Sequence, residues 1–265
     1  MEKMSFRTAL ITGASAGLGA EYARQLAAAG TNLVLVARRL DRLNELAREI
    51  EAAHGVAVDV LQADLASDDG LGLVERRIAG HDTLDLLINN AGFGGRAAFA
   101  KSDVGDHLNM VRVHIDATVR LTRAAVPGMI ARGRGAVINL ASVAAFSPFS
   151  GAMYSGTKSF LVMFSENLQS ELRGKGIAVQ ALCPGLTHTE FHAVAEMDLS
   201  GVPGMFWRTA EYVVRVSLRR LGGRVVCLPG WENKTVAFLM RCPATAAGVR
   251  AVGRSKLVRG KAGGN

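Results

Sequence analysis

Cysteine and long apolar runs are scarce in this sequence. Only three of its 265 residues are cysteines, and they are widely spaced and lack the CxxC pattern, which argues against a disulfide framework and a zinc site. No stretch of roughly 18 uncharged apolar residues occurs, and the N-terminal MEKMSFRTALITG lacks the apolar core of a signal peptide. We therefore expect a cytoplasmic protein with no membrane span and no bound metal.

Acidic residues are missing from the C-terminal end of the chain. The segment 241–265 contains six basic residues and no aspartate or glutamate. It therefore holds six of the eight excess positive charges, and residues 1–240 are left with a net charge of +2. This distribution indicates a solvated basic tail, with a phosphate- or membrane-surface role as the alternative. It does not favour nucleic acid as a partner.

Short apolar runs and helical patterns alternate through residues 1–240. Runs rich in β-branched residues, which predict buried strands, occupy residues 8–12, 32–37, 56–61, 84–88, 136–140, 177–182 and 224–228. Helical spacing of apolar residues is found at 40–54, 67–79, 105–132, 151–174 and 209–221. Such alternation requires right-handed crossovers. We expect a single α/β domain over 1–240, a doubly wound sheet of about seven parallel strands with helices on both faces.

A glycine-rich turn joins the first expected strand to a helix. Residues 12–19 read TGASAGLG and are followed by the helical AEYARQLAAAG. Glycine permits a tight turn and close approach of the backbone to a pyrophosphate, and the start of a helix offers it free N–H groups. A merely structural turn is the alternative to a dinucleotide site. The residues expected to bind the dinucleotide here are Gly13, Ser15, Gly17, Leu18 and Gly19.

No carboxylate stands at the end of the second expected strand, where NAD-binding proteins commonly place an acid that accepts hydrogen bonds from the ribose. The sequence there is Ala37-Arg38-Arg39. Arginine forks suit phosphate oxygens, and Ser15 in the glycine turn adds a further contact. These residues favour NADP(H) over NAD(H), unless both arginines are simply solvated.

Six motifs occur in the same order as in the short-chain dehydrogenase/reductase family, which this sequence resembles over roughly residues 5–230. After the G-x-x-x-G-x-G turn come Asp64-Leu65, Asn89-Asn90-Ala91-Gly92, Ser142, Tyr154-x-x-x-Lys158 and Pro184-Gly185 with Thr189. The resemblance implies a Rossmann-type domain with the cofactor held along the strand ends. It places Asp64 and Leu65 at the adenine, the turn of Asn90, Ala91 and Gly92 along the cofactor, and Pro184, Gly185, Thr187 and Thr189 at the carboxamide.

Ser142, Tyr154 and Lys158 are the candidate catalytic residues. Tyr154 and Lys158 are four residues apart, so on a helix they share one face. A phenol has a pKa near 10, and a neighbouring ammonium group stabilises the phenolate and lowers that pKa. The resemblance implies that Tyr154 transfers a proton at the substrate oxygen and that Ser142 donates a hydrogen bond to the same oxygen. It also implies that Lys158 holds the nicotinamide ribose.

His114 departs from the family pattern. In a helix over 105–132, a rotation of about 100° per residue turns the charged side chains outward and His114 inward. An inward histidine is usually a satisfied core residue. The resemblance implies Asn at this position, where it bends the helix and holds a water linked to the active-site lysine. His114 is therefore a candidate catalytic residue that either replaces Asn in this relay or weakens it.

Residues 190–208 contain a glycine–proline break and several Phe, Met and Trp residues, and the resemblance implies that they cover the substrate. Such side chains suit a bulky apolar substrate, steroid-like or acyl, unless they only pack the segment onto the body. We expect an NADP(H)-dependent oxidoreductase acting on a small-molecule hydroxyl/carbonyl pair. The alternative is a catalytically weak dinucleotide-binding sensor or scaffold. The resemblance also implies a homodimer or homotetramer built on the helices at 105–132 and 151–174.

Overall fold

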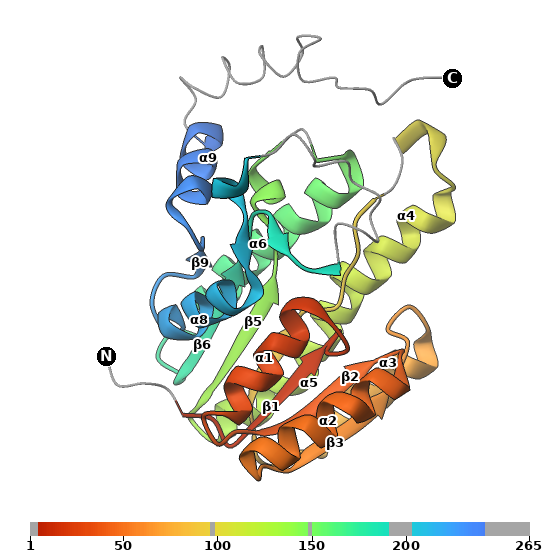
Figure 1. The fold of residues 1–265 in the computed structure, drawn as a ribbon, viewed down its shortest axis with the longest axis vertical. Helices are drawn as coiled ribbons and strands as arrows, with labels where there is room; N and C mark the ends of the chain where they lie inside the picture. Colours follow the sequence, from red (N-terminus) through yellow and green to blue (C-terminus); the bar gives the residue numbers. More distant parts are fainter. Residues whose placement is uncertain (1–4, 96–98, 148–149, 191–202, 242–265) are drawn as a thin grey trace.

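The structure, a computed structural model, describes residues 5–95, 99–147, 150–190 and 203–241. Its main sheet has seven parallel strands in the order β3-β2-β1-β4-β5-β6-β9 (Figure 1). The strands are β1 (Thr8–Thr12), β2 (Asn32–Ala37), β3 (Val58–Gln62), β4 (Leu84–Asn89), β5 (Gly135–Leu140), β6 (Ile177–Leu182) and β9 (Val226–Cys227). The prediction of a doubly wound α/β fold is confirmed, and each strand lies within two residues of its expected run.

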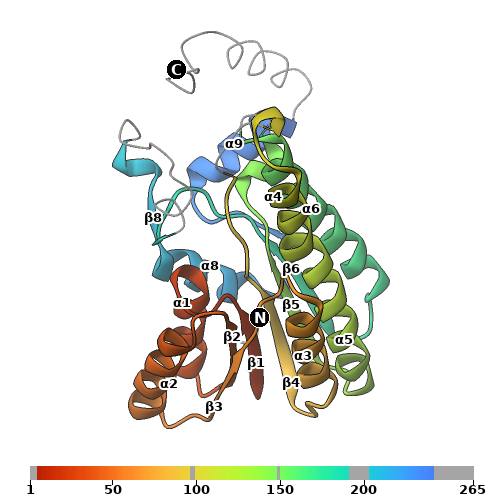
Figure 2. The ribbon, with the colours of Figure 1, turned by 90° about the vertical axis from the view of Figure 1, so that its right-hand side faces the viewer.

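Helices cover both faces of this sheet, as Figure 2 shows. One face carries α1 (Gly17–Ala27), α2 (Leu40–His54) and α8 (Ala210–Arg220). The other carries α3 (Asp68–Ala79), α4 (Val104–Val111), α5 (Ala117–Ala131) and α6 (Ala152–Glu171). Within the described ranges, no helix has the length and hydropathy needed to cross a membrane.

Successive side chains along the strands point to opposite faces of the sheet, which divides the core into two layers. On β1, Ala9 and Ile11 pack with residues of α1, α2 and α8, whereas Leu10 packs with residues of α3 and α5. All three side chains are fully buried, as expected for a strand covered on both faces. Truncating one of these larger side chains to Ala typically costs about 2–5 kcal/mol. The core thus fixes the strand ends from which the site is built.

The helix expected over 105–132 is interrupted. Residues Arg112–Asp116 form a π-helical turn between α4 and α5, a local widening of the helix that is often found at functional sites. His114 lies in this turn with its side chain buried, and the Thr118 hydroxyl donates to the His114 carbonyl at 2.8 Å. The inward direction expected for His114 is therefore correct, but the uniform helix is not.

The end of the described chain forms one helix that the sequence patterns did not predict, α9 (Trp231–Arg241). A two-stranded ladder joins β7 (Thr187–His188) to β8 (Arg208–Thr209). Arg208 of this ladder binds Glu232 of α9 through two contacts of 2.6 and 2.7 Å. Three short 3-10 turns complete the described structure, η1 (Phe99–Lys101), η3 (Val143–Phe146) and η4 (Gly204–Phe206).

Candidate active site and cofactor site

The glycine-rich turn between β1 and α1 has the shape that a dinucleotide phosphate requires. Gly13 and Gly17 adopt positive φ angles of 66° and 56°, which favour glycine. A Cβ at Gly19 would lie 2.4 Å from the Gly13 carbonyl oxygen, so the close chain crossing excludes any side chain. The first turn of α1 carries no acid, and no side chain caps its start, so its N–H groups and positive dipole end suit an anion.

Asn90 and Ala91, at the end of β4, are held directly against this turn. The Asn90 amide Nδ2 donates to the carbonyls of Thr12 and Gly13 at 2.8 and 3.2 Å. The Thr12 hydroxyl accepts from the backbone N–H groups of Asn90 and Ala91 at 2.9 and 3.0 Å. Thr12, which sequence reasoning did not single out, thus joins β1 to β4 at the point where the strand order reverses, the usual ligand crevice of such sheets.

Two arginines from the start of α2 lie beside the glycine turn. The Arg39 guanidinium donates from Nε to Ser15 Oγ at 3.2 Å, and both Arg39 and Arg42 bind the Glu190 carboxylate. The Arg38 side chain is exposed, and its backbone carbonyl accepts a hydrogen bond from the Gln62 side-chain amide. The structure therefore brings the predicted residues Arg39 and Ser15 into contact and adds Arg42 to this site. The only feature of the sequence that could have indicated Arg42 is its position on the first turn of α2.

Asp64 and Leu65 occupy different environments at the end of β3. The Asp64 carboxylate is exposed and accepts from the Ala66 N–H at 3.0 Å, which fixes the turn before α3. Leu65 packs in the core between β2 and α3. Asp64 can therefore contact a ligand through its side chain, whereas Leu65 can do so only through its backbone groups.

The segment after β6 folds back over the glycine turn. Pro184 accepts from the Val143 N–H at 3.0 Å, and the Thr187 hydroxyl donates to the Gly185 carbonyl at 3.1 Å. A Cβ at Gly185 would lie 2.1 Å from Asn233 Oδ1 of α9, so α9 fixes this turn. Thr189 reaches the glycine turn itself, with its Cβ 3.3 Å from where a Gly17 Cβ would lie.

Ser142, Tyr154 and Lys158 meet beyond the end of β5. Ser142 is buried at the start of η3, accepts from the Ala144 N–H at 3.1 Å and hydrogen-bonds the Tyr154 side chain. Tyr154 and Lys158 follow each other on one face of α6, with Lys158 Nζ 5.6 Å from the centre of the Tyr154 ring. The ammonium group donates to the Leu140 carbonyl at 2.7 Å, so its position is set by β5.

Burial dominates the acidity of both groups. It raises the pKa of Tyr154 to about 12, and the hydrogen bond from Ser142 acts in the opposite direction. It lowers the pKa of Lys158, whose side chain is 3% exposed, to about 7. Lys158 is not among the groups that set the pKa of Tyr154 in this structure, so the expected stabilisation of the phenolate by Lys158 stays a prediction.

His114 lies next to this trio and both of its ring nitrogens are engaged by the protein. Its Nε2 accepts from the Phe93 N–H at 3.0 Å, which assigns the proton to Nδ1, and Nδ1 then donates to Thr157 Oγ1 at 3.0 Å. Burial, followed by the charge of Lys158, holds the pKa of His114 well below its usual value. With both ring nitrogens hydrogen-bonded to the protein, the imidazole holds its neighbours in position, and its role in a water relay stays a prediction.

The expected substrate cover falls mostly outside the described residues. Of the segment 190–208, residues 191–202, which include Phe191 and Met197, are not described. Met205 and Phe206 are exposed, and Trp207 stacks on His188 with ring centres 4.8 Å apart. Phe93 and Phe146 are partly buried beside the catalytic residues.

This chain is similar to known proteins in both sequence and fold. The short chain dehydrogenase family model matches residues 7–199. Serine 3-dehydrogenase of Agrobacterium fabrum is 38% identical over 190 residues, which cover 71% of this chain and 74% of that protein. The chain also resembles the structure of a short-chain dehydrogenase from Sphingobium yanoikuyae in complex with NADPH, with a TM-score of 0.81, 32% identity and coverage of 98% of this chain and 99% of that one.

A second solved structure, the bulky-bulky ketone specific alcohol dehydrogenase from Comamonas testosteroni, has a TM-score of 0.77 and 30% identity, with coverage of 99% and 98%. The family match and these relatives agree with the motifs found in the sequence. The chain therefore belongs to the short-chain dehydrogenase family. It is an oxidoreductase of the class that acts on hydroxyl and carbonyl groups.

Proposed function

We propose that this protein is an NADP(H)-dependent oxidoreductase that interconverts a hydroxyl and a carbonyl on a bulky apolar substrate, steroid-like or acyl. The observation that carries the proposal is the arrangement of Ser142, Tyr154 and Lys158 at the end of β5, across the strand-order reversal from the glycine turn. Ligands of open parallel sheets bind in this crevice, beyond the carboxyl ends of the strands.

Tyr154 is the acid in reduction and the base in oxidation. Its raised pKa keeps the phenol protonated at neutral pH, so in reduction it is ready to give its proton to the substrate oxygen while Ser142 donates a hydrogen bond there. Lys158, fixed by the Leu140 carbonyl, holds the nicotinamide ribose and stabilises the phenolate that results. The cofactor, when bound, supplies or accepts the hydride.

The preference for the phosphorylated cofactor rests on the end of β2. Arg39 and Ser15 lie 3.2 Å apart beside the glycine turn, and Arg38 is exposed next to them. Guanidinium groups bind phosphate oxygens through parallel N–H donors. The Sphingobium yanoikuyae structure, which resembles this chain over nearly its whole length, is described in complex with NADPH, and this likeness supports the same choice here.

Two further parts of the proposal concern substrate size and assembly. Phe93 and Phe146 beside the catalytic trio favour an apolar substrate, as does the likeness to a bulky-ketone alcohol dehydrogenase, whereas the likeness to serine 3-dehydrogenase favours a small polar one. Val104 and Leu108 of α4 and Met163 of α6 are exposed apolar residues. They support a homodimer or homotetramer formed through these helices, in a protein that we place in the cytoplasm.

Assaying NADPH oxidation with a panel of carbonyl compounds tests the proposal. The panel should include bulky ketones, 3-oxoacyl thioesters and small polar aldehydes. We expect turnover with at least one bulky compound and a higher kcat/KM for it than for the small ones. Tight NADPH binding without turnover on any member would instead support a sensor or scaffold.

A further inference from the structure

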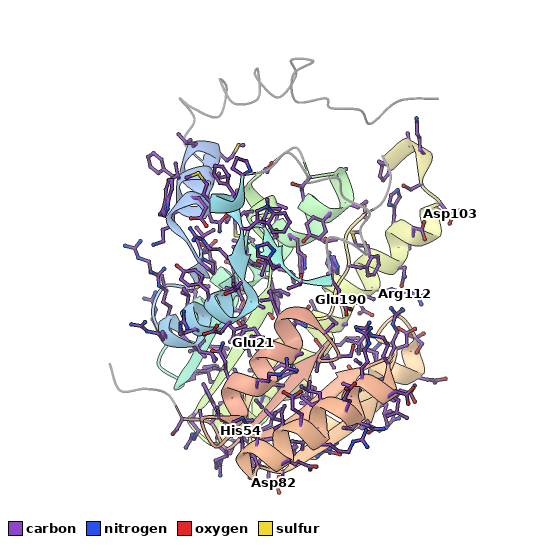
Figure 3. The ribbon with its side chains drawn as sticks, viewed as in Figure 1. Glu21, His54, Asp82, Asp103, Arg112 and Glu190 are labelled. Atoms are coloured by element: carbon purple, nitrogen blue, oxygen red, sulfur yellow. The ribbon has the colours of Figure 1, made fainter. Side chains whose placement is uncertain are left out.

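The proposed 2′-phosphate site contains a carboxylate of the protein itself. Glu190 lies 2.6 Å from a guanidinium nitrogen of Arg42 and 3.2 Å from one of Arg39. Arg39 binds Ser15 of the glycine turn at the same time. Figure 3 places Glu190 beside the start of α1, and its neighbour Thr189 approaches Gly17. The segment after β6 thus places the Glu190 carboxylate next to the end of β2, in the proposed cofactor site.

The donors around Glu190 are those that a phosphate monoester would take. Two guanidinium groups from the start of α2 hold the Glu190 carboxylate, and one of them, that of Arg39, also donates to the Ser15 hydroxyl of the glycine turn. Arginine binds carboxylate and phosphate with the same planar array of N–H donors. A carboxylate and a 2′-phosphate placed here therefore compete for the same groups.

We propose that Glu190 is a specificity-determining residue that competes with the 2′-phosphate of NADP(H) for Arg39 and Arg42. The inference rests on the proposed function and adds Arg42 to the phosphate-binding residues. Binding of NADP(H) requires Glu190 to release both arginines. NAD(H) has no such phosphate, so it binds with the ion pairs intact. Glu190 therefore weakens the binding of NADP(H) but not that of NAD(H), which reduces the preference of this protein for the phosphorylated cofactor.

The energetics permit such an exchange. Arg42 and Arg39 hold the pKa of Glu190 below its usual value, so the carboxylate is charged at neutral pH. About half of each of the three side chains is exposed, so a released carboxylate regains water and the exchange strands no buried charge. Ion pairs this exposed are individually weak. Removing the competitor should therefore change NADPH affinity by a factor of roughly three to ten.

Glu190→Gln tests the proposal, with Kd values for NADPH and NADH measured by calorimetry on the full chain. We expect the variant to bind NADPH roughly three- to tenfold more tightly and NADH as the wild type does. Glu211→Gln is the matched control, because Glu211 forms a similarly exposed ion pair with Arg215 on α8. It should change neither Kd. Equal tightening of both cofactors by Glu190→Gln, or no tightening of NADPH, would overturn the inference.

A second variant separates competition from simple charge removal. Arg42→Gln in the wild-type background removes a phosphate ligand and also loosens the competitor, so its two effects on NADPH binding partly cancel. In the Glu190→Gln background it removes only the phosphate ligand. The loss of NADPH affinity caused by Arg42→Gln should therefore be larger in the second background. Equal losses in the two backgrounds would show that Glu190 and the phosphate do not share Arg42.

The same titrations distinguish this inference from the proposed function. If the wild type binds NADPH and Glu190→Gln binds it with the same Kd, the competition is overturned and the oxidoreductase assignment stays in place. Wild-type protein and Glu190→Gln variant that both fail to bind NADPH would contradict the cofactor assignment, and the inference with it.

Discussion

The Nδ1–H of His114 donates to the hydroxyl of Thr157 at 3.0 Å, and that hydroxyl donates in turn to the Tyr154 carbonyl at 3.0 Å. The bond joins the π-helical turn to the first part of α6, one residue before Lys158. On its other side the imidazole holds the Phe93 N–H. One side chain thus fixes the turn after β4 relative to the helix that carries Tyr154 and Lys158.

Replacing His114 with Asn should lower the free energy of unfolding without altering the acidic side of the pH profile of kcat/KM. Asn is too short to keep both hydrogen bonds, and one lost buried bond costs about 1–3 kcal/mol. Because burial holds the pKa of His114 well below its usual value, its protonation should not shape activity near neutral pH, and kcat/KM should keep the same pH dependence there. Urea unfolding and pH–rate profiles measure the two effects, and His54→Asn, at an exposed position, is the control.

The wild type should also lose stability as the pH falls below 6.5, since the unfolded histidine then takes up a proton that the buried one does not. His114→Asn should lack that part of the loss. A variant that loses the acidic limb of kcat/KM would instead place His114 in the proton path.

Arg39 should matter more to cofactor choice than Arg38, because Arg39 contacts Ser15 at the glycine turn. We expect Arg39→Ala to weaken NADPH binding by roughly 1–2 kcal/mol and Arg38→Ala to weaken it less. NADH affinity should stay nearly constant in both. Arg38→Asp should shift preference towards NAD(H), since it restores an acid to the end of β2. Fluorescence titration with both cofactors gives the comparison, and an unchanged NADPH affinity in all three variants would refute the phosphate assignment.

Lys158 should make stability depend on alkaline pH. Its folded pKa of about 7 lies below the usual 10.5, so between these values the unfolded chain binds the extra proton. The free energy of unfolding should therefore rise as the pH increases from 7 towards 10, by roughly 3–5 kcal/mol at most. Lys158→Met should remove this rise, and Lys175→Met, at an exposed site, should keep it. Parallel pH curves for the wild type and Lys158→Met would contradict the assignment.

Arg208 should be needed to hold α9 in place. It neutralises Glu232, whose side chain is almost fully buried, and keeps the pKa of that carboxyl below its usual range. Arg208→Met leaves the carboxylate without its partner, which should cost about 2–4 kcal/mol. Adding Glu232→Gln should recover part of the loss, as thermal unfolding would reveal. If the double variant is no more stable than Arg208→Met, the ion pair is not what fixes α9.

The strands could be predicted because their patterns are set by burial on both faces. Leu10 and Ile11 belong to opposite layers of the core, and such runs leave little choice but a covered parallel sheet. The helix α9 escaped prediction because its buried face includes Glu232 and Asn233. Apolar spacing cannot reveal a helix that is anchored through polar side chains.

The members of the site could be predicted, but not how they are connected. Ser142, Tyr154 and Lys158 were expected from the resemblance to the family, whereas the rise of the Tyr154 pKa through burial depends on packing. Likewise, Glu190 is far from Arg39 and Arg42 in the chain, and no spacing rule joins them. Contacts between distant segments are set by the fold, so they become visible only in three dimensions.

Turnover by Tyr154→Phe tests the central claim most directly. The variant keeps the ring and loses only the hydroxyl that is to exchange a proton with the substrate. With the best carbonyl substrate of the panel, we expect kcat to fall by a factor of at least about 10², while the Kd for NADPH stays within about twofold of the wild-type value. A variant that binds NADPH and retains wild-type kcat would contradict the account.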